Sequence, residues 1–153
     1  MKKWLRVSIW IIIITFIGIQ FFPVQRDEFK PTTNVDFIDL YKLPNTIGEK
    51  IRMSCYDCHS NQTQYPWYSN IQPFGWIVQK HIKDGKEELN FSDFDNLSNR
   101  MKRSKLESTI SQIEDDKMPL KSYVLLHRSA KIDSTLKKEI ITHLDSLLII
   151  SNR

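Results

Sequence analysis

Apolar residues recur at spacings of three and four in four separate stretches of the chain. This is the period of one face of an α-helix, so the pattern predicts helices rather than strands. Only 4 glycines and 6 prolines occur among the 153 residues, which argues against a β protein with many turns. We therefore predict an all-α domain over residues 46–150, with helices near residues 46–59, 73–85, 101–117 and 134–150.

Signals for helix ends mark where these helices begin and stop. Thr46 and Glu49 match a capping box, in which the threonine side chain and the glutamate three residues later satisfy each other's backbone N–H groups. Gly85 is expected to end the second helix, because glycine favours the position just after a helix. Asp133 or Ser134 is expected to cap the last helix, which we expect to pack across the first.

The N-terminal stretch is almost entirely apolar and lacks the amphipathic pattern of the later helices. Val7 to Val24 would be about 27 Å long as a helix, close to the ~30 Å hydrocarbon core of a bilayer. We predict one N-terminal transmembrane helix within residues 1–24, which serves as a membrane anchor. A cleaved signal peptide is the alternative, although no small-x-small cleavage site follows the run. The basic residues before the run are expected to stay on the cytoplasmic side: Lys2, Lys3 and Arg6.

Residues 25–45 join this anchor to the helical domain. They are rich in polar residues and include Pro31 and Pro44, so we predict a linker with a short helical turn near residues 35–40.

The positive charge of the chain is confined to its N-terminal part. The formal net charge is +4, and four basic residues lie before residue 27. The remainder carries 18 basic and 18 acidic residues and is therefore neutral. A neutral domain gives no support for nucleic-acid binding, which requires a basic patch, so no nucleic-acid partner is expected.

The strongest chemical motif is Cys55-Tyr56-Asp57-Cys58-His59, which has the Cys-x-x-Cys-His spacing of c-type haem attachment. In such a site the two thiols, Cys55 and Cys58, form thioethers with haem, and the adjacent His59 supplies the proximal nitrogen to the iron. A redox or metal-binding Cys-x-x-Cys pair and a structural disulfide are the alternatives. These are the only two cysteines, so the chain lacks the second pair of a four-thiolate zinc site.

The second axial position has three candidates. Met118 lies 59 residues after His59 and directly before Pro119, and methionine is a known sixth ligand in cytochromes c. We predict Met118 as the distal ligand, with core packing as its alternative role. His81, on the apolar side of the second helix, and His127 are the alternative distal ligands.

Aromatic residues are dense just after the motif. Tyr65, Trp67 and Trp76 are candidates for the wall of a haem pocket, with ordinary core packing as the alternative. A haem face buried against such rings is stabilised by several kcal/mol at ~25 cal/mol per Å² of apolar surface.

The chain resembles the haem-binding domain family, whose members are small, exported, cytochrome-c-like proteins. The resemblance covers about two thirds of the chain and implies covalent haem c at Cys55 and Cys58 with His59 as an iron ligand. Phe94 and Gly75 stand where a tryptophan and a larger residue are usual, and these differences concern packing. The residues that carry the resemblance are Cys55 to Tyr68, Pro73, Trp76, His81, Gly85, residues 89–92, Met118, Pro119, Tyr123, His127 and Ala130.

These observations together predict a membrane-anchored monohaem c-type cytochrome that transfers one electron at a time. We expect an electron carrier rather than an enzyme, with a redox partner protein. In bacteria, haem is joined to thiols outside the cytoplasmic membrane, so the domain is expected on the periplasmic side. The alternatives are a haem-based sensor or peroxidase-like protein with an open sixth position, and a haem-free dithiol protein.

Overall fold

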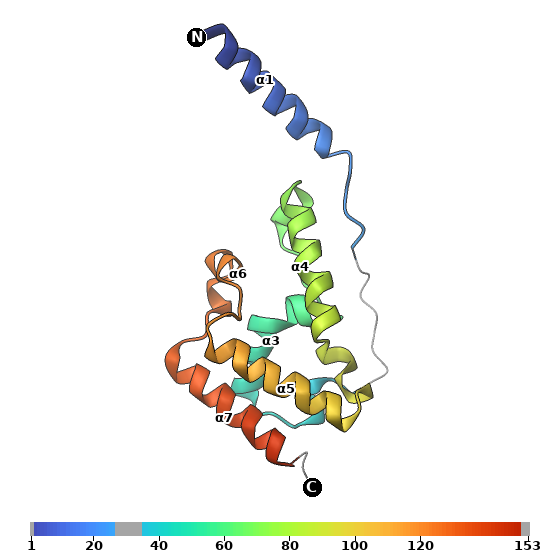
Figure 1. The fold of residues 1–153 in the computed structure, drawn as a ribbon, viewed down its shortest axis with the longest axis vertical. Coiled ribbons are helices and arrows are strands. Elements are labelled where there is room, and N and C mark those ends of the chain that lie inside the picture. The colour runs from blue at the N-terminus through green and yellow to red at the C-terminus, as the bar shows by residue number, and fades with distance from the viewer. Residues whose placement is uncertain (1, 27–34, 151–153) are drawn as a thin grey trace.

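The computed structural model describes residues 2–26 and 35–150. All the elements in this part of the chain are helices and none is a strand, which confirms the all-α prediction (Figure 1). Its elements, in order, are α1 Lys2–Ile19, α2 Phe37–Leu40, α3 Asn45–His59, η1 Trp67–Asn70, α4 Phe74–Glu88, η2 Phe91–Asn96, α5 Asn99–Glu114, α6 Lys121–Leu126, η3 Arg128–Ala130 and α7 Ser134–Ile150.

Helix α1 projects from one end of the helical domain (Figure 1). The prediction of a helix from Val7 to Val24 is only partly met, because α1 ends at Ile19 and its first turns contain basic residues. The apolar part of α1 covers residues 7–19, about 20 Å of helix against the ~30 Å hydrocarbon core. Among the described residues, no helix is both long enough and apolar enough to span a membrane.

A cluster of aromatic rings lies at the centre of the domain. The ring centroid of Phe37 lies 4.9 Å from those of Phe91 and Phe94, and Tyr56 stacks on Phe91 at 5.2 Å. Such pairs add roughly 0.5–1.5 kcal/mol each to the free energy gained by burying the rings. Phe37 and Leu43 are both buried in the core, so the second half of the expected linker belongs to the domain. Residues 27–34 of that linker lie outside the described residues.

Helices α5 and α7 lie side by side, and their apolar faces meet in the same core as α3 (Figure 1). Leu106, Ile110 and Ile113 of α5 are buried against Ile140 and Leu144 of α7. We expected the last helix to pack across the first helix of the domain, which is α3. This expectation is wrong, because the main partner of α7 is α5. Helix α3 also packs against α4.

Two of the predicted helix ends differ from the structure. Helix α3 begins at Asn45 after Pro44, and no side chain caps its first turn, so the capping box of Thr46 and Glu49 does not form. Helix α4 continues past Gly85 to Glu88. The prediction for the last helix is confirmed, because an Oδ1 atom of Asp133 accepts the backbone N–H groups of Thr135 and Leu136.

Candidate functional site

The Cys-x-x-Cys-His motif forms the last turn of α3. Residues three and four apart share a helix face, so Cys55, Cys58 and His59 project from one side of this turn. Both thiols are free and half-buried, and no disulfide joins them. The turn therefore offers two sulfur nucleophiles and an imidazole on a single face.

The imidazole of His59 is held by two backbone carbonyl groups. Its Nδ1 atom lies 2.8 Å from Gly85 O and 3.1 Å from Leu89 O. Carbonyl oxygens only accept hydrogen bonds, so Nδ1 carries the proton and donates it. This tautomer leaves the lone pair of Nε2 available to a metal ion, the arrangement that most metal-bound histidines share.

Gly85 allows α4 to approach the motif closely. A Cβ atom at this position would lie 2.6 Å from the carbonyl oxygen of Cys58 and 3.3 Å from its Cβ atom. A side chain at position 85 would therefore push α4 away from α3. The close contact places Gly85 O within hydrogen-bonding distance of the His59 ring.

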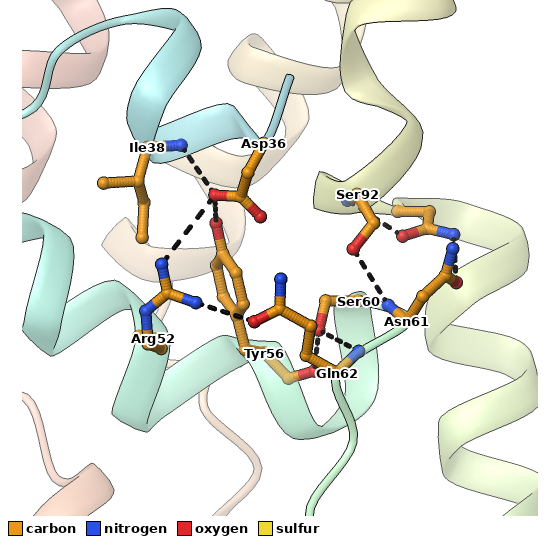
Figure 2. A network of polar contacts seen from close by, with 9 residues as sticks. Asp36, Ile38, Arg52, Tyr56, Ser60, Asn61, Gln62 and Ser92 are labelled. Carbon is orange, nitrogen blue, oxygen red and sulfur yellow. Dashed lines mark hydrogen bonds and ion pairs between the residues drawn. The ribbon is translucent and has the colours of Figure 1, made fainter. Parts of the chain in front are cut away.

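A network of buried polar groups anchors the other side of the motif turn (Figure 2). The hydroxyl group of Tyr56 donates to Asp36 Oδ1 at 2.7 Å, and Asp36 Oδ1 also accepts the N–H of Ile38 at 3.1 Å. Burial, followed by this hydrogen bond, raises the pKa of Tyr56 above its ordinary value. Further along the chain, Ser60 Oγ donates to Tyr56 O at 2.8 Å. These bonds fix the rotation of α3 and hence the direction of its cysteine face.

Two adjoining cavities lie against that face. Their volumes are about 280 and 270 Å³. The first extends toward α5 and the second toward α4, where His81 and Gly85 lie. Both are mainly apolar, a property that suits a porphyrin ring. The residues common to both walls are Ser54, Cys55, His59, Glu88, Met118 and Pro119.

Met118 is brought to the cavity by the end of α5. Asp116 has a positive φ of 54°, which turns the chain after the helix. The N–H groups of Lys117 and Met118 then donate to Gln112 O at 3.0 and 3.1 Å. The thioether of Met118 thus contributes to the same cavities as His59, on a segment that is separate from α3.

A hydrogen bond ties the chain beyond Met118 back to the motif. The hydroxyl group of Tyr123, on α6, donates to Asp57 Oδ2 at 2.6 Å. Burial, then this bond, raises the pKa of Tyr123. The Met118 segment is therefore held at both ends, by Gln112 before it and by Asp57 after it.

Burial favours the neutral forms of the two thiols and of His59. Burial, followed by the neighbouring Cys58, raises the pKa of the Cys55 thiol to about 12. Burial, followed by Asp57, raises the pKa of the Cys58 thiol to about 11. Burial also lowers the pKa of His59, although its carbonyl partners oppose this effect. Neutral imidazole is the form that binds iron.

The residues present fit a haem with two thioether bonds. Cys55, Cys58, His59 and Met118 all line the second cavity, and their side chains are of the types that hold haem c. Ser54 contributes to both cavity walls, and its buried hydroxyl group has no hydrogen-bond partner among the described residues. Such a group is costly unless a ligand or water satisfies it.

The alternative distal ligands differ in their position. His81 is exposed on α4 and contributes to the wall of the second cavity, next to Cys58. His127 does not contribute to either cavity. Its ring stacks on Tyr123 with a centroid distance of 4.2 Å. The structure therefore brings Met118 and His81 to the motif and leaves His127 behind Tyr123.

The aromatic residues expected in the pocket wall lie elsewhere. Trp67 is 75% exposed, Tyr65 donates to Gln79 Oε1 at 3.0 Å, and Trp76 Nε1 donates to Phe22 O at 3.1 Å. None of the three contributes to either cavity. The reason is that η1 and the first turn of α4 lie at the far end of α4 from Gly85 (Figure 1).

Other residues, which the sequence did not assign to a pocket, make the wall instead. Leu89 and Phe91 come from the segment after α4, and Lys105 and Gln112 come from α5. Leu89 and Phe91 belong to residues 89–92, whose only sequence signal is the family resemblance. Lys105 and Gln112 carry no signal, because their role depends on how α5 packs.

Comparison with known proteins agrees with this geometry. No curated protein and no solved structure matches the chain. A family model described as a haem-binding domain matches residues 14–146, which is most of the chain. The chain therefore belongs to the haem-binding domain family.

Proposed function

We propose that this haem-binding protein is a monohaem c-type cytochrome that transfers single electrons. In this proposal Cys55 and Cys58 hold the haem through thioether bonds, His59 is the proximal ligand and Met118 is the distal ligand. Bound in this way, haem iron would supply a one-electron couple. The chain is an electron carrier and works with a redox partner protein.

The observation that carries this proposal is the orientation of His59. Its Nδ1–H is committed to Gly85 O and Leu89 O, so Nε2 is the only ring nitrogen left for a metal. A dithiol protein without haem would have no need of an imidazole locked in this way beside two free thiols and a methionine.

The other residues of the site position and shield the haem. Leu89, Phe91 and Ile113 provide apolar wall to one cavity. An apolar wall and a thioether ligand both favour the reduced state of haem iron, because neither stabilises the additional positive charge of the oxidised state. These features suit a carrier with a comparatively high reduction potential.

We further propose that α1 associates the protein with the cytoplasmic membrane, with the haem domain on its outer side. Trp10, Ile12 and Ile14 are all exposed on α1, and most of its other apolar residues are exposed as well. An exposed apolar helix with basic residues at its start fits a lipid environment on hydrophobic and charge grounds.

Haem attachment can be tested by pyridine haemochrome spectroscopy on denatured, acid-acetone-washed protein. A c-type spectrum is expected from the wild type and should be lost when Cys55 and Cys58 are both replaced by serine. Absence of the signal from haem-loaded wild type would exclude a c-type cytochrome and leave the dithiol alternative.

Distal ligation can be tested with Met118→Ala. The weak far-red band typical of methionine ligation should be lost, and the reduced variant should bind CO rapidly. An unchanged spectrum would exclude Met118 and direct attention to His81, which contributes to the second cavity. Rapid CO binding by the reduced wild type would favour a sensor or peroxidase-like protein over an electron carrier.

A further inference from the structure

Large apolar side chains are exposed at the end of the domain where the chain from α1 arrives. Trp67 and Phe74 are 75% and 54% exposed. Exposed aromatic clusters are unusual on a soluble monomer and commonly mark a surface that contacts something else. We call this region the aromatic end, and it consists of Phe21, Phe22, Trp67, Phe74, Trp76 and Ile77.

The aromatic end also lacks charged residues. None of residues 60–79 is Asp, Glu, Lys or Arg, although 26% of the whole chain is charged. This segment includes η1 and the first turn of α4. Its exposed polar groups are the amides of Gln64 and Asn70. A surface of tryptophan, phenylalanine and neutral amides has the composition of a protein belt at the boundary between lipid and water.

Side-chain hydrogen bonds fasten the end of α1 to this surface. Gln20 Nε2 donates to Gln72 O at 3.0 Å, and Gln72 N donates to Gln20 Oε1 at 2.9 Å. Trp76 Nε1 donates to Phe22 O at 3.1 Å. The aromatic end is therefore continuous with the exposed apolar surface of α1 (Figure 1).

Arg26 extends this attachment through two hydrogen bonds and a contact with an aromatic ring. Its Nη2 atom donates to Ser69 Oγ at 2.8 Å and to Asn70 Oδ1 at 2.7 Å, and its guanidinium group lies 4.7 Å from the centre of the Tyr65 ring. Residues 20–26 are thus held against η1 and the first turn of α4 by these contacts.

We propose that the aromatic end rests in the interfacial layer of a lipid bilayer and fixes the orientation of the haem domain on the membrane. The inference rests on the proposed association of α1 with the membrane. Lipid is favoured over a protein partner because the surface is continuous with α1 and because Arg26 is the only charged residue in residues 20–26 and 60–79, too few charges to set the register of a protein interface. Tryptophan rings are enriched at this depth of a bilayer.

This orientation would set the distance of the haem site from the membrane interface. Gly85, which accepts the hydrogen bond from His59, lies 11 residues after Phe74 on the same helix. At ~1.5 Å per residue, the haem site would lie about 16 Å from the interface along α4. The site would then face partners that are themselves bound to the membrane.

The test is photocrosslinking of the full, haem-loaded chain in lipid nanodiscs. A photoreactive benzophenone amino acid is placed, one position at a time, at residues 67 and 74. Position 10 in α1 reports whether α1 contacts lipid. Position 101 is the matched control, because Met101 is 48% exposed and lies on the first turns of α5, near the other end of α4. Lipid adducts are counted by mass spectrometry, and the haem spectrum verifies folding of each variant.

Lipid adducts at positions 67 and 74, with none above background at position 101, are the expected result. Adducts at position 10 without any at 67 or 74 would overturn the inference while leaving the membrane association of α1 intact. Equal yields at 67, 74 and 101 would overturn it as well, since contact would not be specific to the aromatic end. No adducts at any position would overturn both the inference and the membrane association.

Discussion

At the scale of single residues, Gly85 links the backbone of α4 to the chemistry of the motif. Only a hydrogen atom fits between this position and the carbonyl oxygen of Cys58. The same close approach provides the carbonyl group that orients His59. The packing of α4 on α3 and the orientation of the His59 ring therefore both depend on the absence of a side chain at Gly85.

The variant Gly85→Ala should destabilise the domain by about 1–3 kcal/mol, because the new methyl group forces α3 and α4 apart. Denaturant unfolding of the haem-loaded protein measures this loss. The control is Gly18→Ala in α1, where an added Cβ meets no atom within 4 Å and no loss of stability is expected. Equal stability of the two variants would show that α3 and α4 are not in close contact at Gly85.

Tyr56, within the motif, anchors the side of α3 that faces away from the cysteines through its hydrogen bond to Asp36. Replacing it with phenylalanine leaves the buried carboxylate of Asp36 without the hydroxyl donor that lies 2.7 Å away. We expect Tyr56→Phe to lower the free energy of unfolding by about 1–3 kcal/mol. A double-mutant cycle with Asp36→Ala isolates the interaction, and strictly additive losses would rule out the bond as the cause.

At the scale of elements, the Met118 segment depends on contacts at its two ends. Helix α6 has no buried residue of its own, so the bond between Tyr123 and Asp57 is its main polar link to α3. Tyr123 is thus a positioning residue, which acts through the segment that carries Met118.

The variant Tyr123→Phe should weaken methionine ligation without removing haem. The expected signs are a weaker far-red band and faster CO binding by the reduced protein, while the haemochrome yield stays at the wild-type value. The control is Tyr65→Phe, which removes the hydroxyl group bonded to Gln79, away from both cavities. If both variants keep the wild-type band and CO kinetics, the bond to Asp57 does not position Met118.

The long helices could be predicted from sequence because their apolar spacing is a local property. Helix α3 begins within one residue of the predicted start, and α7 has the predicted bounds. Helix α5 ends three residues earlier than predicted, because Asp116 adopts a left-handed conformation and Lys117 bonds back to Gln112. The role of Gly85 was missed for a related reason: a glycine needed for helix contact and a glycine that ends a helix look alike in sequence.

At the scale of the whole molecule, the motif could be predicted from the sequence, but the residues of the surrounding pocket could not. Cys55, Cys58 and His59 are adjacent in sequence, so their shared face follows from helix geometry alone. The wall around them comes from α4, α5 and the segment before α6, and only tertiary packing decides which of their side chains face inward. Aromatic density near the motif therefore suggested Trp67 and Trp76, which lie at the other end of α4.

The motif and the wall of the pocket come from different elements, so we predict that bound haem stabilises the whole domain. The cavities lie between α3, α4, α5 and the Met118 segment, so haem would contact every one of these elements. Burying ~200 Å² of apolar wall contributes about 5 kcal/mol, and each kcal/mol shifts the melting temperature of a domain of this size by roughly 3–5 °C. The haem-free wild type should therefore melt at least about 10 °C below the loaded protein.

Circular dichroism of the two forms measures this difference. The Cys55→Ala, Cys58→Ala double variant, produced without haem, is the control for effects of the thiols themselves and should melt close to the haem-free wild type. If loaded and haem-free wild type melt within about 2 °C of each other, a difference worth less than ~1 kcal/mol, haem does not fill the cavities between these helices. The stability gain should also fall in Met118→Ala, since that variant loses one of the two bonds that join the iron to separate parts of the fold.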